Sequence, residues 1–296
     1  MDGSWVDTCM ALLFRSSRRK QGRQGGEFQY IITSAGALRY VDTGGDKPPL
    51  LTTPDGPCVI EHYRELIRDL SEDFRVICFD MPGMGFSFPA WRYDFGVKAT
   101  TDCIAELMDH LCVSQVILAF TCANGLFAMN FAKQYPARVS HLILGQTPSL
   151  AGLLNWKHYN IPKLLTLPVA GQIVGGLSKR QLAMKWFSLS LPRESEFKAA
   201  FQHQAVEAMS HGGCFCLPSL VQAAVRVDDE ETKGVQCPVL MVYGDTDFSH
   251  RHTDFNCLLE TIPEAKLIAY PGCGHFPNLE RRADYVADVK QFVGCN

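Results

Sequence analysis

The sequence predicts an α/β fold with a mostly parallel central sheet covered by helices on both faces. Short apolar runs of strand length alternate with amphipathic stretches of helical length in the first half of the chain and again near its end. Between these regions, over residues 148–233, the pattern is helical, with interrupting Pro and Gly and no clear strand. This block is expected to be a helical cap inserted at the carboxyl edge of the sheet, where such sheets bind ligands.

The expected elements follow one another in regular order. The strands are apolar runs bounded by turn residues, at 28–32, 37–41, 49–53, 74–79, 115–120, 139–145, 238–243 and 266–270. The helices show apolar residues at helical spacing, at 61–70, 100–111, 124–134, 255–261 and 283–293. The α/β core is therefore predicted to comprise residues 27–147 and 234–296, with the cap at 148–233 between its two parts.

The first residues and the overall charge restrict the class of protein. Residues 1–26 are rich in Arg, Ser, Gly and Gln and are expected to form a disordered basic tail, with a weak organelle-targeting signal as the lesser alternative. The net charge of −3 argues against a nucleic-acid partner. No apolar run approaches the roughly 20 residues that a membrane-spanning helix needs. The oligomeric state is left open.

The cysteines indicate the compartment. The chain has 12 of them, and their spacing forms neither a disulfide framework nor a set of metal ligands. Free thiols in this number suit a reducing environment, so the protein is expected in the cytoplasm. Because the sequence also has no Gly-rich phosphate loop, we expect no cofactor and no metal.

One segment predicts a nucleophilic side chain at a sharp turn between a strand and a helix. The apolar run Val116–Phe120 leads into Cys122, and a helical pattern begins immediately afterwards. A strand, a sharp turn and a helix in this order form the frame of a nucleophile elbow, usually G-x-S-x-G. Here Phe120 and Asn124 stand at the usual glycine positions. The ring of Phe120 is expected to turn aside, for example into a pocket wall, and Gly125 to restore some of the close approach between strand and helix.

Four segments together resemble the α/β-hydrolase family over residues 28–293. They match its D-x-P-G-x-G-x-S loop, its elbow, its G-x-x-D acid loop and its G-H-x-x-x-x-E segment, at 80–87, 120–125, 244–247 and 274–280. Their order is nucleophile, acid, histidine, as in that family. The resemblance implies the fold strongly and the activity more loosely, because this fold hosts many chemistries and some inactive members.

The resemblance implies a catalytic triad of Cys122, His275 and Asp247, with Asp245 as a near competitor for the acid. His275 would accept the proton of the thiol or hold it as a thiolate–imidazolium pair, while Asp247 would fix the imidazole tautomer. A free thiol has a pKa near 8.5, so a neighbouring imidazolium and the N-terminus of the following helix would be needed to ionise it.

The resemblance also implies an oxyanion hole made of two backbone N–H groups. Ala123 would supply one, and Gly56 in the loop after the third strand would supply the other, although a register shift of one residue would make Asp55 the donor. The usual His-Gly pair is missing from this loop. The alternative is that residues 54–57 form only a rigid turn, and an Asp55 side chain would have to point away from a forming oxyanion.

Three functions remain open from the sequence. The first is hydrolysis of an ester, lactone or thioester through a Cys122 acyl-enzyme, and the second is a lyase, cyclase or cofactor-free oxygenase that uses His275 and Asp247 as a general base. The third is a catalytically silent binding protein. The expected ligand is a small to medium apolar carbonyl compound, because the cap is rich in large aromatic residues. These residues are Trp156, Tyr159, Trp186, Phe187, Phe197, Phe201 and Phe215.

Overall fold

The computed structural model describes residues 3–15 and 27–295. Within them, a sheet of nine strands has the order β1-β2-β4-β3-β7-β8-β10-β11, and β6 pairs with β2. The pairs from β4 to β11 are parallel, while β2 runs antiparallel to β1, β4 and β6. The strands of this sheet are β1 (Gln29–Thr33), β2 (Gly36–Asp42), β3 (Pro49–Thr52), β4 (Arg75–Phe79), β6 (Phe88–Pro89), β7 (Val116–Thr121), β8 (Val139–Gly145), β10 (Val239–Gly244) and β11 (Lys266–Tyr270).

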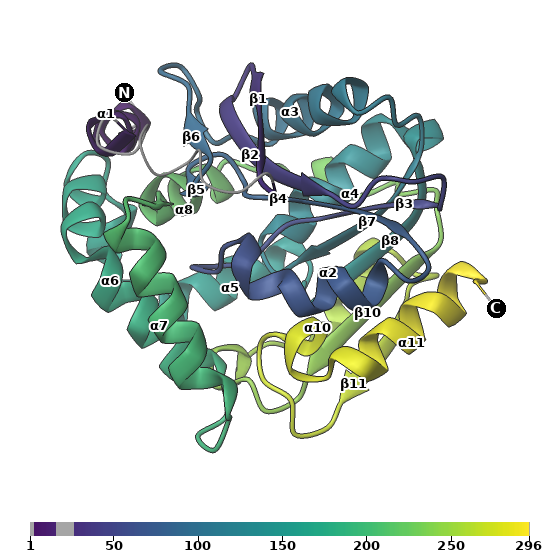
Figure 1. Cartoon of the computed structure of the whole chain (residues 1–296). Coiled ribbons are helices and arrows are strands. Elements are labelled where there is room, and N and C mark those ends of the chain that lie inside the picture. Colours follow the sequence, from purple (N-terminus) through teal and green to yellow (C-terminus); the bar gives the residue numbers. More distant parts are fainter. Residues whose placement is uncertain (1–2, 16–26, 296) are drawn as a thin grey trace.

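Helices cover both faces of this sheet (Figure 1). On one face lie α3 (Val97–His110) and α4 (Asn124–Gln134), and on the other lie α2 (Arg64–Leu70) and α11 (Arg282–Val293). Successive strand residues serve opposite faces: Leu51 and Leu118 pack in the core under α3 and α4, whereas Leu50 and Ile117 pack in the core under α2 and α11. Both faces of β7 are therefore buried along its whole length, as the continuous apolar run requires.

The segment that is predicted to form a cap lies between β8 and β10 in the chain. It contains α5 (Leu150–Asn160), α6 (Ala170–Ser190), α7 (Phe197–Ser210) and α8 (Leu217–Ala224), and α6 and α7 lie side by side in Figure 1. The sequence pattern showed no strand here, but β9 (Cys214–Phe215) pairs antiparallel with β5 (Met84–Gly85). This short pair ties the cap to the loop that follows β4. The remaining short helices are α9 (Leu258–Thr261) and α10 (Pro277–Glu280).

The predicted fold class, a mostly parallel sheet flanked by helices, is confirmed. All eight predicted strands are present within a residue or two of their expected positions. The predicted helix at 61–70 begins as a 3₁₀ turn at Ile60–Tyr63 and becomes α2 at Arg64. Among the described residues, no helix is both long and apolar enough to cross a membrane.

The expectation of a disordered tail over residues 1–26 is wrong for its first part. Ser4–Arg15 form helix α1, which packs against α6 and β6 (Figure 1). Val6 and Ala11 are buried in this contact. The polar composition of the whole segment concealed this apolar face, which becomes useful only once α6 lies beside it. Residues 16–26 of the predicted tail lie outside the described residues.

A buried carboxyl group anchors α1. Asp7 accepts a hydrogen bond of 2.6 Å from the Ser219 hydroxyl on α8. Burial raises the pKa of Asp7 to about 6, although the bonds from Ser219 oppose this shift. An acid whose pKa is higher in the folded than in the unfolded protein stabilises the fold at low pH, and this contribution is lost as the pH rises from about 4 to about 6.

We therefore expect Asp7→Asn to stabilise the protein at pH 7.5 by about 2 kcal/mol, because one pKa unit corresponds to about 1.4 kcal/mol. The amide oxygen still accepts from Ser219, and the cost of ionising a buried acid disappears. Urea unfolding at pH 4 and pH 7.5 measures the effect, with Asp7→Ala as the control that also removes the acceptor. If the free energy of unfolding differs between wild type and Asp7→Asn by the same amount at both pH values, this account is wrong.

Candidate active site

The elbow holds Cys122 in a strained backbone conformation. Cys122 follows β7 directly and has φ = 51°, in the left-handed region that residues other than glycine seldom adopt. Its N–H donates to the Gly145 carbonyl at 2.7 Å, and the Thr147 hydroxyl donates to its carbonyl at 3.0 Å. A Cβ on Gly125 would lie 2.4 Å from Thr147 side-chain atoms. Gly125 thus permits helix α4 to lie close to Thr147, which a side chain at this position of the elbow would prevent.

The two unusual elbow residues have separate roles. Phe120 is fully buried and packs against Phe79, with ring centroids 5.9 Å apart, so it lies in the core and not in the pocket wall. Asn124 lines the pocket, and its side-chain amide donates to the Pro54 carbonyl at 3.2 Å. Asn124 therefore ties the elbow to the loop that follows β3.

The acid and the histidine meet at the carboxyl edge of the sheet. Asp247 follows β10, and its Oδ2 lies 2.5 Å from Nδ1 of His275 in the loop before α10. The same carboxylate accepts from the Ser249 N–H at 2.8 Å and from the Gln146 amide at 3.0 Å. Asp245 is exposed and accepts from the Gly272 N–H instead. Sequence reasoning missed Gln146, which directly follows β8 and helps to hold Asp247.

The side chain of Asp55 occupies the other nitrogen of the histidine. Its Oδ2 lies 2.9 Å from Nε2 of His275. Asp55 was expected to offer at most its backbone N–H, with its carboxylate pointing away from a forming oxyanion, but the carboxylate points toward His275. Asp55 lines the pocket whereas His275 is completely buried behind it, so this carboxylate screens the imidazole from the cavity.

These contacts determine the charges at rest. Burial opposes a charge on His275, but the two carboxylates, Asp247 foremost, and the nearby Cys122 sulfur raise the pKa of His275 well above its usual value. Burial raises the pKa of the Cys122 thiol, and the negative charge of Asp55 raises it further. His275 and the Ala123 N–H lower it only in part. The resting site is thus a neutral thiol beside an imidazolium held by two carboxylates, not a thiolate–imidazolium pair.

The two expected oxyanion donors both lie on the pocket. Ala123 and Gly56 line it, and Gly56 has φ = 56°, which suits glycine. The Ala123 N–H lowers the pKa of the Cys122 thiol. A Cβ on Gly56 would lie 2.9 Å from the indole nitrogen of Trp186, so this position accepts only glycine without movement of Trp186. That buried indole N–H has no hydrogen-bond partner in the part of the chain that the structure describes.

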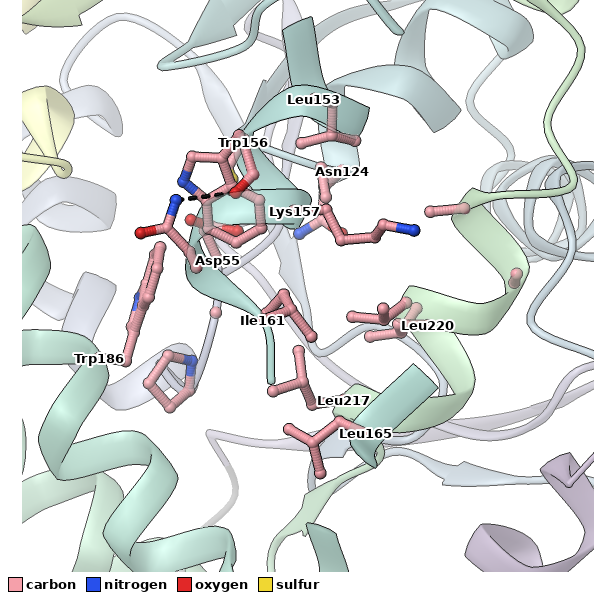
Figure 2. A pocket seen from close by; sticks show the side chains of 18 of the residues that line it. Asp55, Asn124, Leu153, Trp156, Lys157, Ile161, Leu165, Trp186, Leu217 and Leu220 are labelled. Atoms are coloured by element: carbon pink, nitrogen blue, oxygen red, sulfur yellow. Dashed lines mark hydrogen bonds between the residues drawn. The ribbon is translucent and has the colours of Figure 1, made fainter. Parts of the chain in front are cut away.

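The pocket lies between the elbow and the cap and has a cavity volume of about 150 Å³. Figure 2 shows Asp55 and Trp186 on one side of it and Leu165, Leu217 and Leu220 on the other. Three of the seven cap aromatic residues line it: Trp156, Trp186 and Phe215. Tyr159, Phe187, Phe197 and Phe201 lie elsewhere, and Phe187 and Phe201 pack with Phe276 in the core. The lining is mainly apolar, with Lys157 and Lys185 as its basic members.

A second histidine lies beside the site and was missed by sequence reasoning. His250 ends the short 3₁₀ helix after Asp247, and its ring stacks on His275 with centroids 5.3 Å apart. Burial and the charge of His275 lower the pKa of His250 to about 3, so His250 is neutral. One side-chain donor atom from each of Cys122, His250 and His275 lies within 4.8 Å of the others, so that among the described residues these three are close enough together to hold a metal ion.

Comparison with known proteins agrees with this architecture. A family model described as "alpha/beta hydrolase fold" matches residues 55–165. The chain is 22% identical over 276 residues to a pimeloyl-[acyl-carrier protein] methyl ester esterase of Nitrosospira multiformis, covering 86% of this chain and 97% of the relative. It is 23% identical to a 2-hydroxy-6-oxo-2,4-heptadienoate hydrolase of Pseudomonas putida, covering 86% of this chain and 91% of that relative.

A solved structure gives the same result for the fold. The crystal structure of a hydrolase from Pseudomonas aeruginosa PA01 superimposes with a TM-score of 0.72 at 20% identity, covering 92% of this chain and all of that one. The chain therefore has the α/β-hydrolase fold, as the four sequence segments indicated. Its matched relatives are esterases and hydrolases, which supports an enzyme of the α/β-hydrolase class.

The charge of Asp55 beside Cys122 leads to a prediction about the reactivity of the Cys122 thiol. In Asp55→Asn the negative charge that raises the pKa of Cys122 is gone, so a larger fraction of the thiol is ionised at pH 7. We expect alkylation of Cys122 by iodoacetamide to become about tenfold faster for each pKa unit removed. Peptide mass spectrometry across a pH series measures this rate, and the exposed Cys112 serves as an internal reference.

The matched control is Asp245→Asn, which neutralises an exposed carboxylate of the neighbouring acid loop. It should leave the alkylation rate of Cys122 unchanged. If the alkylation rate of Cys122 depends on pH identically in wild type and in Asp55→Asn, Asp55 does not influence the pKa of this thiol.

Proposed function

We propose that the protein hydrolyses an ester, lactone or thioester of a small to medium apolar acid through the triad Cys122, His275 and Asp247. The observation that carries this proposal is the position of Cys122: it sits at the elbow, lines the pocket and has a donor atom of His275 within 4.8 Å of its sulfur. The esterase and hydrolase names of the relatives support the reaction class. The cavity of about 150 Å³ and its apolar lining favour a compact, apolar acyl group.

The reaction begins with a proton transfer away from His275. Asp55 takes the Nε2 proton as a neutral carboxylic acid and turns aside, which leaves a neutral imidazole that still donates from Nδ1 to Asp247. The imidazole then accepts the thiol proton, and the sulfur attacks the substrate carbonyl. The Ala123 and Gly56 N–H groups stabilise the resulting oxyanion. His275 returns the proton to the leaving group, and a water activated by His275 later cleaves the acyl-enzyme.

Neutralising Asp55 before the attack serves a second purpose. A carboxylate beside the loop 54–57 would repel the developing oxyanion, whereas a carboxylic acid would not. We therefore propose that the triad becomes active only when Asp55 has taken the proton and released Nε2 of His275.

A second candidate function is ligand binding without turnover. The contact between Asp55 and His275 favours it, because this carboxylate occupies the imidazole nitrogen that should receive the thiol proton. Pro54 stands in the loop where a backbone donor is commonly found and has no N–H to give. In this alternative the pocket would bind the same apolar carbonyl compounds, and the triad residues would have only a structural role.

The domain boundaries and the compartment are also proposals. We propose that residues 148–233 form the cap over a core of residues 27–147 and 234–296, since the helices α5 to α8 all fall within that range. We propose a cytoplasmic location, since all 12 cysteines are free thiols.

The test is a burst experiment with short-chain aryl esters and thioesters. Wild type is expected to release a stoichiometric burst of the leaving group and to carry an acyl group on Cys122, visible by mass spectrometry. Cys122→Ala should lower turnover by at least about a thousandfold, since removing a nucleophile leaves only binding and the oxyanion hole. Cys112→Ser is the matched control and should be fully active.

The other functions predict different results. A general-base lyase, cyclase or oxygenase would lose activity in His275→Ala but keep much of it in Cys122→Ala. A silent binding protein would turn over none of the substrates in wild type or in Asp55→Asn, yet would bind an apolar carbonyl compound with measurable heat. Full turnover in Cys122→Ala would exclude the acyl-enzyme.

A further inference from the structure

Three side chains that are distant in the sequence converge beside the pocket with the atoms of a metal centre. They are Cys122 after β7, His250 after β10 and His275 before α10, and all three are buried. One donor atom of each lies within 4.8 Å of the other two. Ligands of a tetrahedral zinc ion, with bonds of about 2.0–2.3 Å, lie about 3.5 Å apart, so small side-chain movements would close this set around an ion.

His250 is the observation that points to a ligand. Its Nδ1 lies 3.0 Å from the Thr253 hydroxyl. Its Nε2 is buried and has no hydrogen-bond partner among the described residues, although a buried polar atom without a partner is costly. The ring is only 4% exposed and is stacked on His275, which aims it into the cluster. Neither the elbow nor the triad uses this nitrogen, so its orientation is unexplained by the proposed hydrolysis.

The surroundings orient both rings as they are oriented in metal sites. In such sites the remaining ring nitrogen of each ligating His commonly bonds to a carboxylate, a backbone carbonyl or a water. Here Nδ1 of His275 is held by Asp247, and Nδ1 of His250 is held by Thr253. Nε2 of His250 is thus left for an ion. Nε2 of His275 is bonded to the Asp55 carboxylate at 2.9 Å, so this carboxylate must swing from that nitrogen toward an ion before it can act as a fourth ligand.

We propose that Cys122, His250 and His275, with Asp55 as the fourth ligand, bind a zinc ion. One sulfur, two imidazole nitrogens and one carboxylate oxygen form a donor set that suits Zn²⁺ in a tetrahedral site. A thiol must lose its proton before it can ligate a metal, so binding of Zn²⁺ releases protons. The charges of the thiolate and the carboxylate balance that of the ion.

This metal site uses the same residues as the proposed catalytic centre. The metal-bound form and the catalytically active form therefore exclude each other. A sulfur that is bonded to zinc is no longer available to attack a carbonyl. The metal-loaded protein would therefore be inactive as a hydrolase. The inference uses the residues of the proposed function but does not require that function, because metal uptake can be measured without any substrate.

The experiment uses the full chain, first treated with a chelator, and Co²⁺ as a spectroscopic substitute for Zn²⁺. Wild type is expected to bind one ion, to show the near-ultraviolet band of a thiolate–cobalt bond and the intense visible bands of tetrahedral Co²⁺, and to lose these bands when Zn²⁺ is added. Zn²⁺ binding to wild type in weak buffer at pH 7 should release protons. This second measurement needs no variant.

The variants separate this site from the other thiols and imidazoles. His250→Gln should weaken Zn²⁺ binding by at least about 100-fold, and Thr253→Val by about tenfold, in line with the loss of a ligand and of its orienting partner. Cys122→Ala should lose the thiolate–cobalt band. The matched controls are His252→Gln and Cys112→Ser, which change exposed residues of the same types and should bind as wild type does.

The inference is overturned if the thiolate–cobalt band persists in Cys122→Ala, if His250→Gln binds as tightly as wild type, or if wild type takes up no ion. Its failure is distinguishable from failure of the proposed hydrolysis. Turnover in the presence of chelator without a cobalt spectrum would overturn only the metal site. A cobalt spectrum of the loaded protein, together with no turnover of any acyl substrate by the chelator-treated protein, would overturn only the hydrolase.

Discussion

The imidazole of His275 is shared by two carboxylates, and the chemistry available at the site follows from this arrangement of charge. Asp247 reaches it from the end of β10 and Asp55 from the loop after β3. Both strands end at the same edge of a parallel sheet, which is why two acids distant in the sequence can bond to one ring. The ring is favoured as a cation, and the neighbouring thiol is favoured as a neutral group.

The two proposals together give this site three states, which differ in what lies between the Asp55 oxygen and Nε2 of His275. With a proton there, the triad is at rest. With the carboxyl group neutral and turned aside, the thiol can pass its proton to the ring and act as a nucleophile. With a metal ion there, the sulfur becomes a ligand. These states exclude one another because each uses the same nitrogen lone pair, which makes Asp55 the residue that selects among them.

The sequence supported most of the architecture and the order of the triad because both depend on local patterns. Continuous apolar runs predicted the buried strands, and the elbow identified Cys122. Asp55 and His250 were not recognised as partners of His275, because such contacts join residues far apart and have no local periodicity. The D-G pair at Asp55 and Gly56 is equally typical of a turn. Helix α1 was missed for a related reason: its apolar residues gain a partner only when α6, far away in the sequence, lies against them.

Helix α6 connects two distant parts of the molecule. Near its beginning it packs against α1, and at its end the Ser190 carbonyl accepts the backbone N–H of His275 at 2.9 Å. A helix of 21 residues is a rod of about 30 Å. Trp186, which packs against Gly56 and His275, lies on the last turn of this rod. Shortening the chain before residue 16, or joining a bulky fusion partner there, would therefore act on the element that positions the imidazole of His275.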